Sequence, residues 1–389
     1  MRLFAAALTA IVGVTTLVCA APQSVAAPQS VAAPQSIAVE TEAKEAYLFV
    51  GFQEKSENVS FWLSRGNDPL NYQALPKAQP LLTSEPAQSV PIASRRRVGT
   101  GGVRDPFLVR AARPGGPNYI LATDASLKLI NYNFDLVNRY GTHGFLVWAS
   151  APGSLTSWDP TPKLVNIVPD NFGFVAAPEA IWDPAKGKYL LTWSSAYFGT
   201  ANPKDHSGQA SPTKIFYAYT DNFVDLHSEN PRFPEVYLDL SASQTGGSLR
   251  DLTLRYVGKS PVGQGDCYVR FFREDTDGAL KVRGQISDNG LFGKFKDIGQ
   301  GPTEWYLEQG DANGGPLFFK DNRDPDLWHV WVDLFATGYK PFDTGPDALS
   351  RTPHYSPSAS NGGFPKDLKQ GSVEPITKAE YDEILRTLG

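Results

Sequence analysis

The chain has 389 residues, of which 12% are aromatic, and it contains 35 glycines and 31 prolines. Many aromatic residues and many turn-forming residues indicate numerous short strands, and they exclude a coiled coil. Lysine and arginine number 36 against 41 aspartates and glutamates, a net charge of −5, which argues against a nucleic-acid-binding protein.

The N-terminal segment is predicted to be cleaved and then followed by a linker. Arg2 precedes a mostly apolar run that ends at a small-residue cleavage site after Ala20, so residues 1–20 are typical of a secretory signal peptide. Residues 21–44 hold three copies of a six-residue Ala-Pro-Gln-Ser repeat, and such small, proline-containing repeats cannot build a core. We therefore expect a secreted, extracellular protein, with a disordered linker and a folded domain at 45–389.

Short apolar runs broken by Gly, Pro, Asn and Asp follow, in five groups. The groups recur at roughly 70 residues, and a repeat of that size with three or four strands predicts the blades of a β-propeller. The predicted strands are 47–52 and 60–64; 105–110, 119–123 and 144–148; 180–182, 189–193 and 214–219; 252–256, 267–272 and 280–284; and 317–319 and 328–332.

The first group is one strand short, and residues 371–376 near the C-terminus can supply the missing strand. The fold class is therefore predicted to be all-β, a five-bladed β-propeller whose ring is closed by the N- and C-terminal strands. Residues 378–388 show the one clear helical pattern, with Thr377 as N-cap and Glu380 at capping-box spacing.

Acidic residues open the first predicted strand of three groups. They are Asp105, Glu179 and Asp251. Because the first strand of each propeller blade lines the central axis, we expect these carboxylates to converge on one pocket. One ionised carboxylate that activates water and one protonated carboxyl that donates to the leaving oxygen suit glycoside hydrolysis. The alternative is that these acids are ordinary turn residues before strands, since Asp-Pro pairs recur throughout the chain.

Several segments resemble glycoside hydrolase family 43, above all its secreted arabinofuranosidase- and arabinanase-like members, which are five-bladed propellers. The resemblance covers about residues 45–385 and implies an inverting mechanism. It implies that Asp105 is the general base, that Asp251 orients the acid and tunes its pKa, and that Glu179 lines the pocket. The segments are GTGGVRDPFLVR (99–110), NYILATD (118–124), APEAIWDPAKGKYLLTWSS (177–195) and GGPLFFKDNRDPDLWHVWVDLFATGYKPF (314–342).

The residue that the resemblance implies as general acid is missing. In the family it is a glutamate directly before Gly-Pro at the start of a blade, and Gly314 stands in that place. Glu308 and Asp311 are the nearest candidate substitutes, and Glu274 and Asp275 are further ones. Loss of a general acid typically lowers the rate by ~10²–10⁴-fold.

Three further residues complete the expected substrate site. Arg104 is expected to bind substrate, and His143 is a candidate for the rim of the pocket, although its position favours a plain turn residue. Trp305, in a Gly- and Pro-rich loop, is the best platform for a sugar ring. The histidines show no zinc-ligand spacing, so we expect no metal and no required cofactor. Gln370 stands where the family often has a histidine that serves a central ion, which argues against a calcium ion there.

Three functions remain open from the sequence. The leading hypothesis is a monomeric enzyme that hydrolyses α-L-arabinofuranosidic bonds of plant cell-wall polysaccharide. Its partner would be an oligo- or polysaccharide, with no nucleic acid and no membrane. The second is a catalytically inactive carbohydrate-binding propeller that lost its acid at Gly314. The third is a structural propeller that binds protein.

Overall fold

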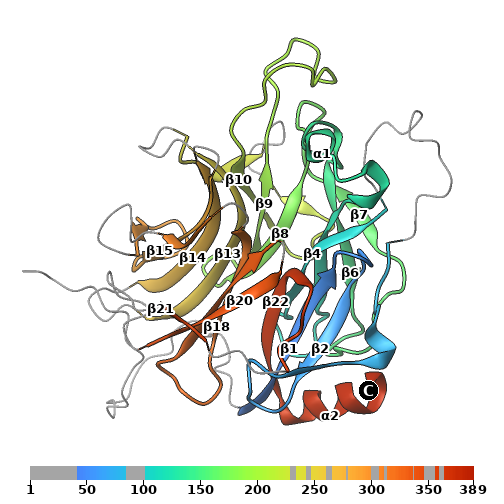
Figure 1. The fold of residues 1–389 in the computed structure, drawn as a ribbon, viewed down its shortest axis with the longest axis vertical. Helices are drawn as coiled ribbons and strands as arrows, with labels where there is room; N and C mark the ends of the chain where they lie inside the picture. The colour runs from blue at the N-terminus through green and yellow to red at the C-terminus, as the bar shows by residue number, and fades with distance from the viewer. Residues whose placement is uncertain are drawn as a thin grey trace, which may run out of the picture.

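The computed structural model is a ring of five antiparallel sheets around a common centre (Figure 1). The predicted five-bladed β-propeller is therefore confirmed, and we number its blades I to V from the N-terminus. Residues 1–41, which hold the predicted signal peptide and nearly all of the predicted linker, lie outside the described residues. The structure describes residues 42–84, 101–227, 234–241, 247–259, 265–276, 279–298, 306–310, 313–335, 337–345, 355–358 and 363–389.

Blade I joins the two ends of the described chain. Its strands run in the order β22 (Leu368–Thr377), β1 (Lys44–Gln53), β2 (Ser60–Ser64) and β3 (Tyr72–Ala74). β22 pairs with β1 along nearly its whole length, red beside blue in Figure 1. The predicted closure of the ring by the two terminal strands is thus confirmed.

Each of the other blades is built from one continuous segment, with its first strand at the centre. These first strands and β22 contact one another in turn and close an inner ring. The strands are β4 (Val103–Val109), β5 (Tyr119–Asp124), β6 (Gly144–Ala149) and β7 (Lys163–Asn166) in blade II; β8 (Ala176–Asp183), β9 (Lys188–Ser195), β10 (Lys214–Thr220), β11 (Leu226–His227) and β12 (Glu235–Leu238) in blade III; β13 (Ser248–Lys259), β14 (Asp266–Thr276), β15 (Ala279–Ser287), β16 (Lys296–Asp297) and β17 (Tyr306–Gly310) in blade IV; and β18 (Asn313–Lys320), β19 (Trp328–Leu334), β20 (Gly338–Thr344) and β21 (Tyr355–Pro357) in blade V.

Helices are few among the described residues. The predicted C-terminal helix is α2 (Lys378–Leu388), and its capping box is present, since Thr377 accepts from the Glu380 backbone while Glu380 accepts from the Thr377 backbone. A shorter helix, α1 (Phe134–Tyr140), precedes β6 and was not predicted. Nothing helical in the described part of the chain is both long and apolar enough to span a bilayer.

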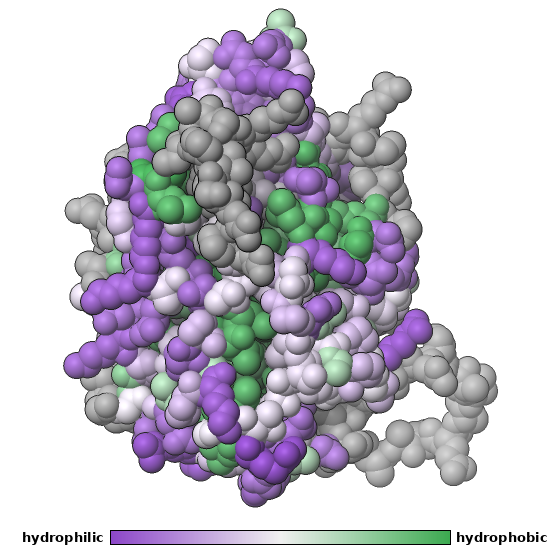
Figure 2. Space-filling model, turned by 90° about the vertical axis from the view of Figure 1, so that its right-hand side faces the viewer, coloured by the Kyte–Doolittle hydropathy of each residue, from purple (hydrophilic) through white to green (hydrophobic). Residues whose placement is uncertain are grey.

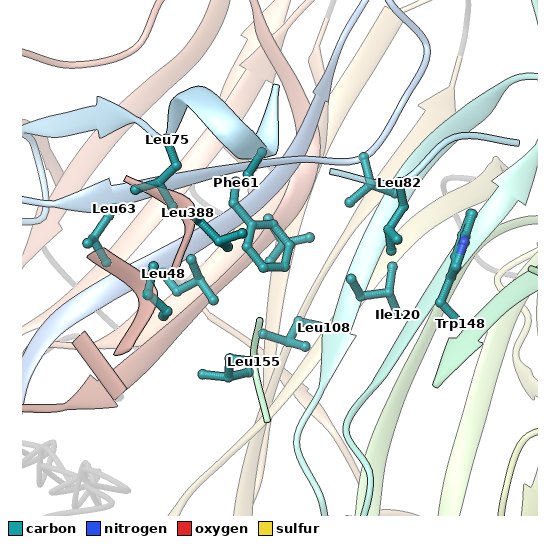
Figure 3. Close-up of a cluster of buried hydrophobic side chains, with 14 of the residues drawn as sticks. Leu48, Phe61, Leu63, Leu75, Leu82, Leu108, Ile120, Trp148, Leu155 and Leu388 are labelled. Atoms are coloured by element: carbon teal, nitrogen blue, oxygen red, sulfur yellow. The ribbon is translucent and has the colours of Figure 1, made fainter. Parts of the chain in front are cut away.

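Apolar side chains fill the spaces between blades. Figure 3 shows one such cluster, in which Leu48 and Phe61 of blade I face Leu108 and Ile120 of blade II. Leu388 of α2 packs into the same cluster, so the helix covers one end of this interface. Each large side chain buried in this way contributes about 1.5–3 kcal/mol.

The outer surface is more polar than this interior. On the face shown in Figure 2, hydrophobic residues gather in separate patches between hydrophilic ones. Such scattered apolar residues are normal on a protein surface.

The first strand of every blade carries a β-bulge at the same height. The first bulged residue has a left-handed backbone in blades II to V, with φ of 51° at Asp105, 49° at Ala177, 54° at Asp251 and 47° at Gly315. A bulge bends the strand and redirects side chains. The pairing register shifts between Arg104 and Phe107, between Ala176 and Glu179, between Arg250 and Thr253, between Gly314 and Leu317, and in β22 between Lys369 and Ser372.

The bulges correct one sequence-based prediction. Asp105, Glu179 and Asp251 were expected to open their strands, yet β4, β8 and β13 begin two to four residues earlier than the predicted strands 105–110, 180–182 and 252–256. The reason is that the bulge interrupts pairing locally and does not end the strand. The acids therefore lie inside the strands.

Closure of blade I can be tested at Gly371. A Cβ at this position would lie 2.1 Å from the Val50 carbonyl oxygen and 2.8 Å from the Gly51 Cα. Both are backbone atoms of the paired strand, so Gly371→Ala should lower the free energy of unfolding by about 1–3 kcal/mol, as overpacking does. Denaturant unfolding measures the change.

The matched control is Gly199→Ala, where a Cβ would meet no atom within 4 Å. Equal stability of the two variants would contradict the close pairing of β22 with β1 at Gly371.

Candidate active site

Two aspartates occupy the same bulge position in the inner strands of blades II and IV, on either side of blade III. Asp105 of β4 and Asp251 of β13 are each the first bulged residue of their blade. Thr123 of β5 donates a hydrogen bond of 2.8 Å to Asp105 Oδ2 and accepts one of 2.8 Å from the Ala177 backbone. The site is thereby tied across the interface between blades II and III.

The surroundings of Asp105 suit a general base. Burial, helped by the negative charge of Asp251, raises its pKa to about 6, although Arg104 and the Thr123 hydroxyl oppose the shift. At neutral pH the carboxylate is ionised and still basic enough to accept a proton from water.

Asp251 is held by a cation in the adjacent strand. Arg273 of β14 donates to Asp251 Oδ2 at 3.1 Å and is itself held by Asp275, whose Oδ1 lies 2.8 Å from Arg273 Nε. Ser194 Oγ of blade III accepts from the Asp251 backbone at 3.1 Å. A carboxylate fixed in this way can orient a neighbouring acid, the role that the family resemblance implies.

The position of the missing acid points at Asp251. A Cβ added to Gly314 would lie 3.2 Å from Asp251 Oδ2, so a side chain at this position would enter the site. The same Cβ would lie 2.7 Å from Cζ of Phe335, a ring that is 41% exposed. In this chain an aromatic ring therefore occupies the space next to Gly314.

Glu179 lies two residues beyond the bulge position that the two aspartates occupy. It follows the bulge of β8, and the residue that corresponds to Asp105 and Asp251 in this blade is Ala177. Glu179 is 6% exposed, and burial raises its pKa to about 8 against the opposing charge of Arg255. At neutral pH it is mostly protonated and can donate a hydrogen bond.

The remaining predicted residues have different surroundings. Arg104 Nη1 contacts Glu54 at 2.9 Å and Glu57 at 3.4 Å, so it anchors blade I to blade II beside Asp105. His143 is 5% exposed, with Nδ1 3.8 Å from Asp170 Oδ1. Its contact with substrate stays a prediction.

Of the candidate substitute acids, Glu274 and Asp275 have partners of their own. Glu274 is fully buried against Arg283 at 3.1 Å, and Asp275 holds Arg273. The backbone of Glu308 lies in β17, which pairs with the third strand of blade IV. Trp305 and Asp311 lie outside the described residues.

The sequence did not point to Asp333 of β19, a buried acid that lies beside Gly314. It is 3% exposed, pairs directly with Gly314 across the sheet, and has Lys369 Nζ 3.6 Å from its Oδ1. Burial raises its pKa to about 7, Asp251 adds to the rise, and Lys369 opposes it. No sequence motif marks this residue, because only the strand register places it beside Gly314.

No metal site stands out in the described part of the chain, which lacks any group of three or more His, Cys, Asp or Glu residues placed to hold an ion. Gln370 packs against the backbone of Gly315, where an added Cβ would lie 3.0 Å from the Gln370 Cβ. The doubt about a central calcium ion therefore stays a prediction.

Comparison with known proteins identifies the family of this chain. A family model described as "Probable glycosyl hydrolase domain", related to glycoside hydrolase family 43, matches residues 42–382. An α-L-arabinofuranosidase of Bifidobacterium longum subsp. longum is 28% identical over 305 residues, which is 71% of this chain and 26% of the relative. The chain thus spans about a quarter of that relative's length.

Among solved structures, an α-L-arabinanase of Cellvibrio cellulosa complexed with arabinohexaose is 14% identical over 81% of this chain and 96% of its own, with a TM-score of 0.46. An α-L-arabinofuranosidase of Lactobacillus brevis is 13% identical over 72% of this chain and 74% of its own, with a TM-score of 0.40. Because the family match covers nearly the whole described domain, the chain belongs to the glycosyl hydrolase family related to glycoside hydrolase family 43.

Proposed function

We propose that the protein is a secreted glycoside hydrolase that cleaves α-L-arabinofuranosidic bonds of plant cell-wall polysaccharide with inversion. The observation that carries this proposal is the pair Asp105 and Asp251, which lie at the same bulge position of two blades with different partners. The arabinofuranosidase relative supports the choice of sugar. Secretion rests on the sequence of residues 1–20.

In the proposed reaction Asp105 takes a proton from the attacking water. Thr123 holds one oxygen of this carboxylate, which fixes the direction of the other. Asp251, with Arg273 beside it, orients the group that protonates the leaving oxygen. Glu179, mostly protonated at neutral pH, would donate a hydrogen bond to a sugar hydroxyl. Arg104, His143 and Trp305 remain proposed contacts to the substrate.

A second candidate function is favoured by Gly314. A glycine cannot donate a proton, so the chain would bind sugar without turnover if no other acid replaced the missing glutamate. This binding protein would keep the same arrangement of Asp105 and Asp251. We further propose a monomer that needs no cofactor, nucleic acid or membrane.

The base is tested by Asp105→Asn. An amide cannot accept the proton from water, so arabinose release from arabinan should fall by at least ~10²-fold. The control is Asp183→Asn, a buried aspartate at the far end of β8. The proposed function is wrong if the wild type releases no sugar from any pentoside tested.

The pH dependence gives an independent check of Asp105. Its raised pKa of about 6 means that the active, ionised form is lost as the pH falls through 6. We expect kcat/KM to decline on the acid side near pH 6, and near pH 4 for an unperturbed aspartate. An acid limb near pH 4 would contradict the assignment.

A glutamate at position 314 distinguishes the active glycosidase from the sugar-binding protein. Gly314→Glu alone should destabilise the protein by about 1–3 kcal/mol, because its Cβ would overlap Phe335, and Phe335→Ala in the same chain should relieve the loss. We expect the wild type to be active already and the double variant to gain little. Turnover found only in the double variant would instead support the binding protein.

A further inference from the structure

In blades II and IV the second strand reaches the candidate active site at one particular position. The residue opposite the last paired residue before the bulge is Thr123 in blade II and Arg273 in blade IV. Thr123 donates to Asp105 and Arg273 donates to Asp251. Side chains at this position therefore contact the bulge aspartates directly.

Asp333 is the residue at the same position in blade V, opposite Gly314. Directly opposed residues of antiparallel strands have Cβ atoms about 4.5–5.5 Å apart and side chains on the same face. A carboxyl on Asp333 is thus presented to the space that a side chain at Gly314 would enter, and that space ends at Asp251.

The Asp333 carboxyl accepts a hydrogen bond from the Gln370 backbone but keeps one oxygen without such a bond. Its Oδ1 has no hydrogen-bond partner among the described residues, and Lys369 Nζ lies 3.6 Å away. Burial and the charge of Asp251 keep a large fraction of this carboxyl protonated near neutral pH, as a proton donor requires.

We propose that Asp333 is the general acid, and that it delivers from β19 the proton that the family resemblance assigns to a glutamate at position 314. This inference rests on the proposed function.

The Asp333 proton passes to the glycosidic oxygen as the bond from that oxygen to the anomeric carbon breaks, and the bonding electrons stay on the oxygen. Water forms the new bond to the anomeric carbon and gives its proton to Asp105. Phe335 lies over Gly314, so the leaving group reaches Asp333 when this ring turns aside.

The test compares two leaving groups in the Asp333→Asn variant. An acid is essential for an arabino-oligosaccharide and nearly dispensable for a dinitrophenyl arabinofuranoside, whose leaving group needs no proton. We expect kcat/KM to fall ~10²–10⁴-fold on the oligosaccharide and far less on the aryl substrate. Asp333→Glu should recover part of the loss, and Asp183→Asn should leave the ratio of the two substrates unchanged.

A second readout uses the wild type alone, in case Asp333→Asn does not fold. With the oligosaccharide, kcat/KM should decline on the alkaline side near pH 7, and this limb should be absent with the aryl substrate. Equal losses on both substrates in Asp333→Asn, or the same alkaline limb with both in the wild type, would overturn the assignment of Asp333 and leave the proposed function standing. A wild type that hydrolyses neither substrate would contradict the proposed function, and Asp333 as its acid with it.

Discussion

The left-handed bulge in the first strand of blades II to V is the constraint on which the site depends. A non-glycine residue in this conformation costs about 1–2 kcal/mol, and Asp105, Ala177 and Asp251 all adopt it. Hydrogen bonds across blades hold it in place, from Ala177 to Thr123 and from Asp251 to Ser194. Ring closure through β22 and β1 therefore fixes the relative positions of carboxylates that are far apart in the sequence.

Several carboxyl groups share one poorly solvated centre, and their different surroundings give them different pKa values. Asp105 is ionised above pH 6, whereas Glu179 and Asp333 hold protons at higher pH because burial outweighs the nearby cations. The base and the proposed acid thus titrate within a narrow interval around neutral pH. This separation of roles is what an inverting glycosidase requires.

The sequence predicted the strands, the terminal closure, the capping box at Thr377 and the family, because these depend on local patterns and ordered motifs. It also led to Asp105 and Asp251. The pairing register of the strands could not be predicted from local patterns. The bulge of β8 begins at Ala177, two residues before Glu179, so Ala177 and not Glu179 corresponds to Asp105. Asp333 was missed for the same reason, since only cross-strand pairing places it beside Gly314.

A crystal structure of the Asp105→Asn variant with a bound arabino-oligosaccharide tests the central claim most directly. We expect the Asp333 carboxyl within hydrogen-bond distance of the glycosidic oxygen. We expect residue 105 on the opposite face of the sugar, with the two side chains roughly 6.5–9.5 Å apart as in inverting pairs. A different carboxyl at that oxygen, or a sugar bound away from the bulges, would contradict it.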